Sequence, residues 1–201
     1  MKKEIKHKNS YNFDDLVEIM RCLRAPDGCP WDSMQTHESI RPCLIEEAYE
    51  LAEAIDLNNR DMMLEECGDV LLQAVFHALI AEDRKEFTME DMMTMLCQKL
   101  LSRHTHIFGD VIANNETEAY AAWDSAKKKE KGQTTAADSL KSVAKTLPPV
   151  IRAAKVMKKA KKAGYTKTID DSAINKVKTA EQELNKAIEE YIKQFESWEK
   201  P

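Results

Sequence analysis

The sequence predicts an all-α protein. Of its 201 residues, 43% are hydrophobic and 32% are charged, and only 5 are glycine. Alanine, leucine, methionine, glutamate and lysine, which favour helices, are abundant, and runs of β-branched residues are few. Apolar residues recur at spacings of three and four through most of the chain, which is the period of a helix with one buried face. These observations favour a bundle of amphipathic helices.

Charge and cysteine usage narrow the class of protein further. The net charge of −5 gives no case for a nucleic acid or an acidic membrane as a partner. Acidic residues dominate up to about Glu118, whereas lysine dominates from Lys127 to Lys167. No segment has the composition of a signal peptide or the length of a transmembrane helix. The five cysteines are scattered without a Cys-x-x-Cys pair, which predicts reduced thiols and a cytoplasmic location.

The first helical pattern begins after Asn12 and ends in a predicted loop at residues 24–32. Two prolines and a glycine within this short span enforce the loop. Trp31 lies in it, and two interpretations of Trp31 stay open. The side chain could cover the core as a hydrophobic plug, which is the more frequent role of tryptophan. It could instead offer a flat surface on which a nucleobase stacks.

A second helix is predicted from Pro42, because proline suits a first helical turn, to about Leu57. Its predicted core stripe, spaced at threes and fours, consists of Leu44, Ala48, Leu51 and Ile55. Glu46, Glu50 and Glu53 lie nearly opposite this stripe, and Glu47 falls between the two sides. Glu47 and Glu50 therefore flank the boundary between core and solvent. Taken alone, this pattern is more typical of a solvated acidic face than of a functional site.

The third helix, with Asp61 as its predicted N-cap, changes that interpretation. Residues 70–81 are apolar nearly all round, which indicates a buried helix. Four polar residues nevertheless share one line at spacings of three, four and four: Glu66, Asp69, Gln73 and His77. Buried polar groups need partners. If Glu66 and Asp69 face the acids of the second helix, four carboxylates converge, and they cannot all stay ionised without a cation. Ligands that are all oxygen atoms favour Mg²⁺ or Mn²⁺ over zinc.

The fourth helix begins at a capping pattern formed by Thr88 and Asp91. Lys99 and Arg103 continue its apolar line. Their stems could lie along the apolar surface with the charged heads in water. Alternatively, both cations could reach the acidic site and hold phosphate oxygens there. His104 and His106 follow directly, and a loop cap or a phosphate contact suits them better than metal ligation, because no cysteine or further histidine stands close by.

The remaining chain contains helices at residues 116–129, 150–163 and 171–198. Trp123 and Lys127 share a face of the first, where Trp123 is either a core residue or a second aromatic wall. We predict a catalytic domain at residues 1–133, a linker at 134–148 and a separate helical segment at 149–201. The last helix has a strict three–four alternation of apolar residues, which is typical of a bundle or coiled coil. No second acidic constellation accompanies it.

With these residues in hand, the chain resembles the MazG family of nucleoside triphosphate pyrophosphohydrolases from Leu16 to about Gln133. The motifs that carry the resemblance are Gly28-Cys29-Pro30-Trp31-Asp32, Glu46-Glu47-x-x-Glu50, Glu66-x-x-Asp69 before Val70-Leu71-Leu72-Gln73, and Lys99-x-x-x-Arg103-His104-x-His106-x-Phe108. A single Glu-Glu-x-x-Glu motif would be weak. The ordered set at family-like spacing is highly specific.

The resemblance implies a fold and an activity. The fold would be a MazG-like all-α bundle that forms a homodimer. The activity would be Mg²⁺-dependent cleavage of a nucleoside triphosphate into a monophosphate and diphosphate, with Mn²⁺ as a substitute, in the service of nucleotide-pool sanitation. By position, the residues that look like metal ligands are Glu47, Glu50, Glu66 and Asp69. Lys99 and Arg103 look like phosphate-binding cations, and Glu46 like a further ligand or an activator of water. The base would contact Trp31, Trp123 and Lys127.

Many relatives carry two such domains in tandem, and residues 147–155 resemble the lead-in to the second. Thr179 and Ala180 stand where the paired acids of a second domain would be. We therefore expect residues 149–201 to form a truncated second segment that binds no metal. Its loss puts the strength and breadth of activity in question.

Three alternatives remain. The first is an all-α pyrophosphohydrolase restricted to dUTP, dCTP or phosphoribosyl-ATP, in which the acids would look alike. The second is a non-catalytic helical module that binds a nucleotide or a protein, against which the four intact acids argue. The third is a ferritin-like di-iron bundle, which needs Glu-x-x-His pairs. Neither Glu50 nor Glu66 has a histidine three residues on.

Overall fold

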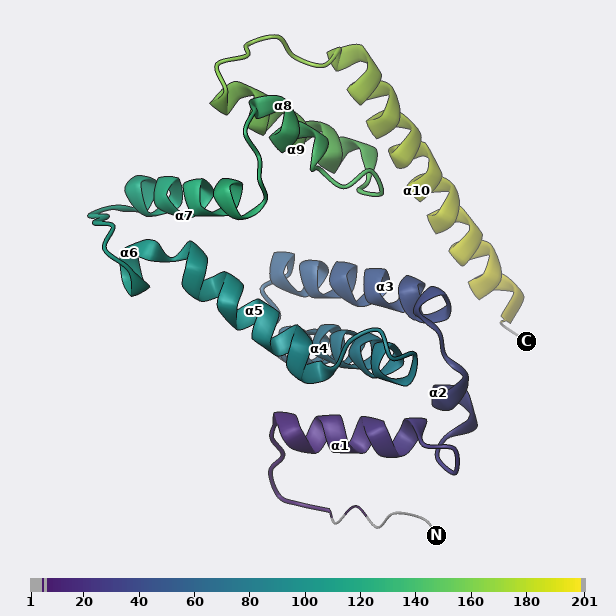
Figure 1. Cartoon of the computed structure of the whole chain (residues 1–201). Helices are drawn as coiled ribbons and strands as arrows, with labels where there is room; N and C mark the ends of the chain where they lie inside the picture. Colours follow the sequence, from purple (N-terminus) through teal and green to yellow (C-terminus); the bar gives the residue numbers. More distant parts are fainter. Residues whose placement is uncertain (1–4, 6, 200–201) are drawn as a thin grey trace. The chain divides into compact units, whose positions relative to one another are not determined.

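The computed structural model describes residue 5 and residues 7–199. Within that part of the chain it consists of ten α-helices and no β-strand, which confirms the all-α prediction. The chain divides into two compact units, Met1–Leu101 and Ser102–Pro201. We call them the N-terminal and C-terminal units. The N-terminal unit holds α1 (Phe13–Arg24), α2 (Pro30–Met34), α3 (His37–Asp56), α4 (Arg60–Asp83) and most of α5 (Met89–Arg103), as Figure 1 shows.

The antiparallel pair α3 and α4 is the centre of the N-terminal unit, and the two helices lie side by side in Figure 1. α3 begins earlier than the predicted start at Pro42. Thr36 caps it, because its hydroxyl accepts the Ser39 N–H at 3.2 Å and the Ser39 hydroxyl accepts the Thr36 N–H at 2.9 Å. Pro42 therefore lies inside the helix. The cap outweighs the local preference of proline for the first turn.

A short turn joins the two helices. Asn58 adopts a positive φ of 50°, a left-handed conformation that asparagine tolerates better than most residues. The Asn59 side chain then accepts the Asp61 and Met62 N–H groups at 3.2 and 3.3 Å. Asn59 is thus the N-cap of α4, and the prediction that Asp61 is the cap is wrong.

The core of the N-terminal unit lies at one end of this helix pair. It is built from α1, the start of α3, the second half of α4 and the start of α5, with these buried residues at its centre: Met20, Ile40, Val75, Phe76, Leu79, Ile80 and Met89. The predicted burial of the apolar run in α4 is confirmed for most residues from Gln73 to Ala81, but Leu71 and Ala74 are exposed.

The predicted core stripe of α3 is only partly correct. Leu44 and Leu51 are half-buried, whereas Ala48 and Ile55 are exposed. The buried residues of α3 are Ile40 and Ala54. Glu47 stands seven residues from each, and seven residues are nearly two helical turns, so Glu47 lies on the same line. The packed face of α3 therefore contains an acid at its midpoint.

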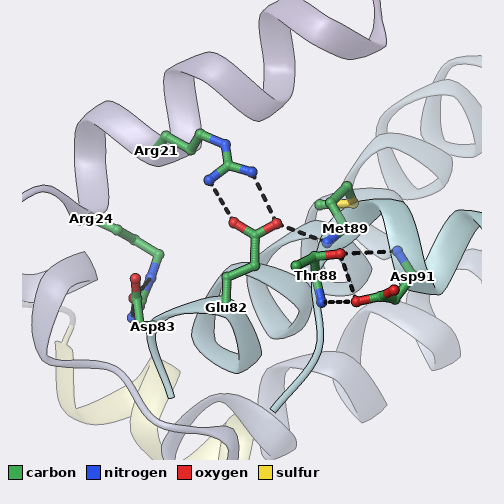
Figure 2. Close-up of polar contacts among 7 residues, drawn as sticks. All are labelled: Arg21, Arg24, Glu82, Asp83, Thr88, Met89 and Asp91. Carbon is green, nitrogen blue, oxygen red and sulfur yellow. Dashed lines mark hydrogen bonds and ion pairs between the residues drawn. The ribbon is translucent and has the colours of Figure 1, made fainter. Parts of the chain in front are cut away.

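Three helices are held together by a polar clamp (Figure 2). Two nitrogens of Arg21 on α1 contact the Glu82 carboxylate of α4 at 2.5 and 2.9 Å. The same carboxylate accepts the backbone N–H of Met89, at the start of α5, at 2.7 Å. The predicted capping pattern of α5 is confirmed, since the Thr88 N–H and hydroxyl both donate to Asp91.

Arg24 fixes the segment that carries Trp31. Its guanidinium pairs with Asp83 at 2.6 Å, donates to the Asp32 carbonyl at 2.7 Å and lies 5.3 Å from the centre of the Phe76 ring. The loop predicted at residues 24–32 is shorter than expected. α2 begins at Pro30 because proline is well suited to the first position of a helix, so Trp31 is helical.

The C-terminal unit contains α6 (Thr105–Phe108), α7 (Glu116–Glu130), α8 (Ala136–Lys141), α9 (Pro149–Lys162) and α10 (Asp171–Glu199). The linker predicted at residues 134–148 is not an extended connection. It contains α8, which the Thr135–Asp138 capping box starts, and Ser139 and Val143 are buried in it. The proposed domain boundaries stay a prediction. Among all the helices described, none is both long and apolar enough to cross a lipid bilayer.

Candidate functional site

Carboxylates from α3 and α4 converge in the N-terminal unit. One ligand oxygen from each of Glu47, Glu66 and Asp69 lies within 4.8 Å of the others, and all three residues are half-buried. Glu50, one turn after Glu47, interacts electrostatically with Glu47 and Glu66 and is itself exposed. The structure thus brings together four of the predicted acids. Glu46 is exposed and lies outside the group of three.

The electrostatics of this cluster disfavour negative charge. Burial raises the pKa of Glu47, and the neighbouring carboxylates of Asp69 and Glu50 raise it further. The pKa of Glu66 is also raised, first by burial and then by Glu50, Glu65 and Asp69. The groups that act on each acid are other acids. Such a cluster binds protons or a cation more tightly than isolated carboxylates do.

The donor set fits a hard divalent metal ion. All the ligand atoms are carboxylate oxygens, and the three that lie closest are near enough together to contact one ion. Their partial burial leaves the cluster accessible to a phosphate ligand. The cluster is therefore a possible metal-binding site, and it lies on two packed helices, which hold ligands more rigidly than loops do.

After Glu66 and Asp69, the polar line of α4 continues toward the core with Gln73 and His77. Gln73 is only 7% exposed, and its Oε1 has no hydrogen-bond partner among the described residues. His77 Nδ1 lies 2.8 Å from His37 Nδ1, with the two rings stacked at 13°. Burial first, and then His37, lowers the pKa of His77, which favours the neutral ring. His77 therefore has a partner within the protein, and the sequence pattern did not reveal His37 as that partner.

Other predicted substrate residues gather in the C-terminal unit. The Arg103 guanidinium lies 5.6 Å from the centre of the Trp123 ring, and Lys127 Nζ lies 4.5 Å from it. Arg103 also forms two 2.8 Å contacts with the Glu130 carboxylate, a partner that the sequence pattern did not reveal. Trp123 is therefore a platform for two cations. Lys99 is half-buried on α5 in the N-terminal unit.

The remaining predicted residues have less defined surroundings. Trp31 is 60% exposed, and its ring centre lies 6.4 Å from that of the core residue Phe76. That exposure is more than a plug over the core would leave. The rings of His104 and His106 lie 5.8 Å apart, and within the described chain they belong to no group of three metal-ligating side chains.

Comparisons with known proteins agree on one family. The MazG nucleotide pyrophosphohydrolase domain matches residues 35–108. This stretch holds the four converging carboxylates, Lys99 and Arg103. The nucleoside triphosphate pyrophosphohydrolase/pyrophosphatase MazG of Thermotoga maritima is 43% identical over 175 residues, which cover 87% of this chain and 67% of that protein.

Two further matches are shorter or more distant. The nucleoside triphosphate pyrophosphohydrolase of Escherichia coli K12 is 36% identical over 166 residues, 82% of this chain and 63% of that protein. The chain thus spans about two thirds of the length of both relatives. The crystal structure of a MazG-related protein from Thermotoga maritima matches with a TM-score of 0.49 and 29% identity, over 57% of this chain and 98% of that one.

Proposed function

The chain belongs to the MazG family, and we propose that it hydrolyses nucleoside triphosphates to nucleoside monophosphates and diphosphate with Mg²⁺. The observation that carries this proposal is the convergence of Glu47, Glu66 and Asp69 within the matched stretch. Relatives that share 43% and 36% of the aligned residues bear the name nucleoside triphosphate pyrophosphohydrolase. An acidic cluster repels a triphosphate, because both are negatively charged, unless a cation lies between them.

Glu47, Glu66 and Asp69 would hold the metal, and Glu50 would supply a fourth carboxylate. Bound Mg²⁺, or Mn²⁺ in its place, would neutralise phosphate charge and lower the pKa of a water molecule. Glu46, exposed beside Glu47, is a suitable group to accept a proton from attacking water or to add a ligand. No covalent nucleophile is required by this scheme.

We assign the phosphate chain to Lys99 and Arg103 and the base to Trp31, Trp123 and Lys127. Because Glu130 already forms a bidentate pair with Arg103, phosphate binding there would replace one anionic partner by another. The open face of Trp31 suits stacking without preference for a particular base. An enzyme that accepts nucleotides with different bases would suit a role in nucleotide-pool sanitation.

We also propose that the active form is a homodimer in the cytoplasm. Large apolar side chains of α3, the following turn and α4 are exposed to solvent: Ile45, Tyr49, Ile55, Leu57, Leu64 and Leu71. A second copy would cover part of this apolar surface. The five free cysteines are compatible with a reducing compartment.

The test compares pyrophosphate release by the wild type, Glu50→Gln and Asp69→Asn, using a panel of standard and modified nucleoside triphosphates. We expect a loss of about a hundredfold or more in both variants, because each substitution removes a charged oxygen from the metal site. Glu53→Gln is the matched control, since Glu53 is exposed on the same helix one turn further on. Circular dichroism checks that helical content is unchanged.

Full activity in both variants would contradict the assignment of these acids. A folded wild type that releases no pyrophosphate with either Mg²⁺ or Mn²⁺ would favour the non-catalytic alternative. Activity with a single substrate such as dUTP would favour the narrow-specificity alternative.

A further inference from the structure

The C-terminal unit contains a strongly basic cavity of about 650 Å³, formed by α7, the segment around α8, and α9. Six of its lining residues are lysines: Lys127, Lys128, Lys155, Lys158, Lys159 and Lys162. Among the described residues, Asp124 is the one acid that lines it, and this carboxylate is paired with Lys128 at 3.0 Å. The cavity walls therefore carry a large excess of positive charge.

Some of these lysines are held in place by the protein. Lys159 Nζ donates to the Ser139 carbonyl at 3.0 Å and to the Ser139 hydroxyl at 2.7 Å. Lys162 Nζ lies 3.7 Å from the centre of the Tyr120 ring. A second cavity of about 740 Å³ lies along α7 and α9 and shares Tyr120, Asp124, Lys128, Lys158 and Lys162 with the first. Glu116 also lines it, so this second cavity is less basic than the first.

The positive charges in and around the cavity also affect the pKa of Lys127. Burial lowers the pKa of Lys127, and the positive charges of Lys131, Lys159 and Arg103 lower it further, against the opposing effect of Asp124. The single carboxylate in the lining thus does not balance the cations around it. Such a cavity attracts an anion with several charges.

We propose that this basic cavity binds a diphosphate or triphosphate chain, either free or as part of a nucleotide. Lys155, Lys158 and Lys162 of α9, together with Lys128 of α7, would contact the phosphate oxygens. The volume is that of a small-molecule pocket. A nucleic acid is disfavoured, because the chain as a whole is acidic, with a net charge of −5.

This site shares no residue with the carboxylate cluster. The cluster lies on α3 and α4 of the N-terminal unit and requires a metal ion to accept a phosphate. The lysine cavity requires none. Trp123 and Lys127, to which we assign the base of the substrate, also line the cavity. Binding of a phosphate chain to the lysines can nevertheless be measured without hydrolysis.

Calorimetric titration of the full chain with tripolyphosphate, and separately with ATP, tests the proposal at low salt in EDTA. The removal of divalent metal leaves the carboxylate cluster repulsive to both ligands. The test variant is Lys158→Gln/Lys162→Gln. The control, Lys141→Gln/Lys161→Gln, removes two charges from α8 and α9 that do not line the cavity.

We expect the wild type and the control to bind tripolyphosphate and the test variant to bind about tenfold more weakly, since it loses two charge-assisted contacts. Binding should weaken as salt is added. A Glu50→Gln/Asp69→Asn variant should bind as the wild type does, even when it releases no pyrophosphate.

Binding of ATP with an affinity similar to tripolyphosphate would support the phosphate chain as the recognised group. Binding of ATP but not of tripolyphosphate would overturn the proposal, as would equal binding by the test variant and the wild type. Tighter binding of a single-stranded oligonucleotide than of tripolyphosphate would also overturn it, in favour of a nucleic-acid site.

Discussion

Glu47 occupies a position on α3 that packing against α4 would normally give to an apolar side chain. Ile40 and Ala54, seven residues before and after it, are 1% and 0% exposed. Glu47 lies between these two positions, and burial raises the pKa of its carboxylate. The carboxylate also lies close to those of Glu66 and Asp69. The cost of placing an acid there is the physical reason to expect a cation at this point.

Gly28 and Gly68 differ in the space available for a Cβ atom, and substitution by alanine tests this difference. A Cβ at Gly28 would lie 2.3 Å from the Cys22 carbonyl oxygen and 2.5 Å from that of Leu23. We expect Gly28→Ala to lower the free energy of unfolding by about 1–3 kcal/mol, because backbone atoms cannot move aside easily. The measurement is urea denaturation followed by circular dichroism.

Gly68 is the matched control. It lies within α4, and apart from its chain neighbours and the nearby backbone of that helix, a Cβ there meets no atom of the described residues within 4 Å. Gly68→Ala should raise the free energy of unfolding by about 0.5–1 kcal/mol, since alanine favours the helix. Equal denaturation midpoints for Gly28→Ala and the wild type would show that the close approach at Gly28 is not needed.

At the scale of elements, the clamp around Glu82 joins α1, α4 and α5. Its carboxylate accepts from Arg21 and from the Met89 N–H, and its side chain is 16% exposed. Burial pushes the pKa of Glu82 upward, but the hydrogen bonds from Arg21 and Met89 outweigh burial and hold the pKa below its usual value of 4.5. One carboxylate thereby links three helices.

Glu82→Gln should lower the free energy of unfolding at pH 7 by about 1–3 kcal/mol, because a charged hydrogen-bonded group is lost. A folded-state pKa below that of the unfolded chain stabilises the fold above pH 4.5, and this stabilisation disappears as the pH falls through the lowered value. The difference between the wild type and Glu82→Gln, measured by urea denaturation, should therefore shrink in acid.

Glu90→Gln is the control for the clamp, because Glu90 is exposed in the first turn of α5. A difference between the wild type and Glu82→Gln that stays constant from pH 7 to pH 3 would contradict the proposed contribution of the ionised carboxylate.

At the scale of the whole molecule, the exposed apolar side chains of α3 and α4 predict self-association. The wild type should elute with a mass near twice the 23.0 kDa of one chain when light scattering follows size-exclusion chromatography. Leu64→Lys, at a side chain that is 69% exposed, should shift the equilibrium toward the monomer, because a charge would be buried in the interface.

Ile151→Lys provides a control for self-association, since Ile151 is 49% exposed on α9 in the C-terminal unit. This variant should keep the mass of the wild type. A wild type that elutes as a monomer at every concentration would contradict the proposed homodimer.

Local patterns in the sequence were enough to predict the helical class, the burial of most of the second half of α4 and the presence of acids on two consecutive helices. These features follow from local composition and from the helical period, which is visible in the spacing of apolar and polar residues along a single segment. The spacing of Glu66, Asp69, Gln73 and His77 already indicated that one buried helix carried a polar line. The cap at Thr88 and Asp91 was also visible locally.

The face of α3 that meets α4, and hence the position of Glu47 on the packed line, is visible only in the folded chain. The same is true of the His37–His77 contact and of the Arg103–Glu130 pair, whose members are 40 and 27 residues apart. A helical period gives the relative direction of side chains along one segment, but it does not give the rotation of that segment against another. That rotation is set by the packing of side chains from distant parts of the chain.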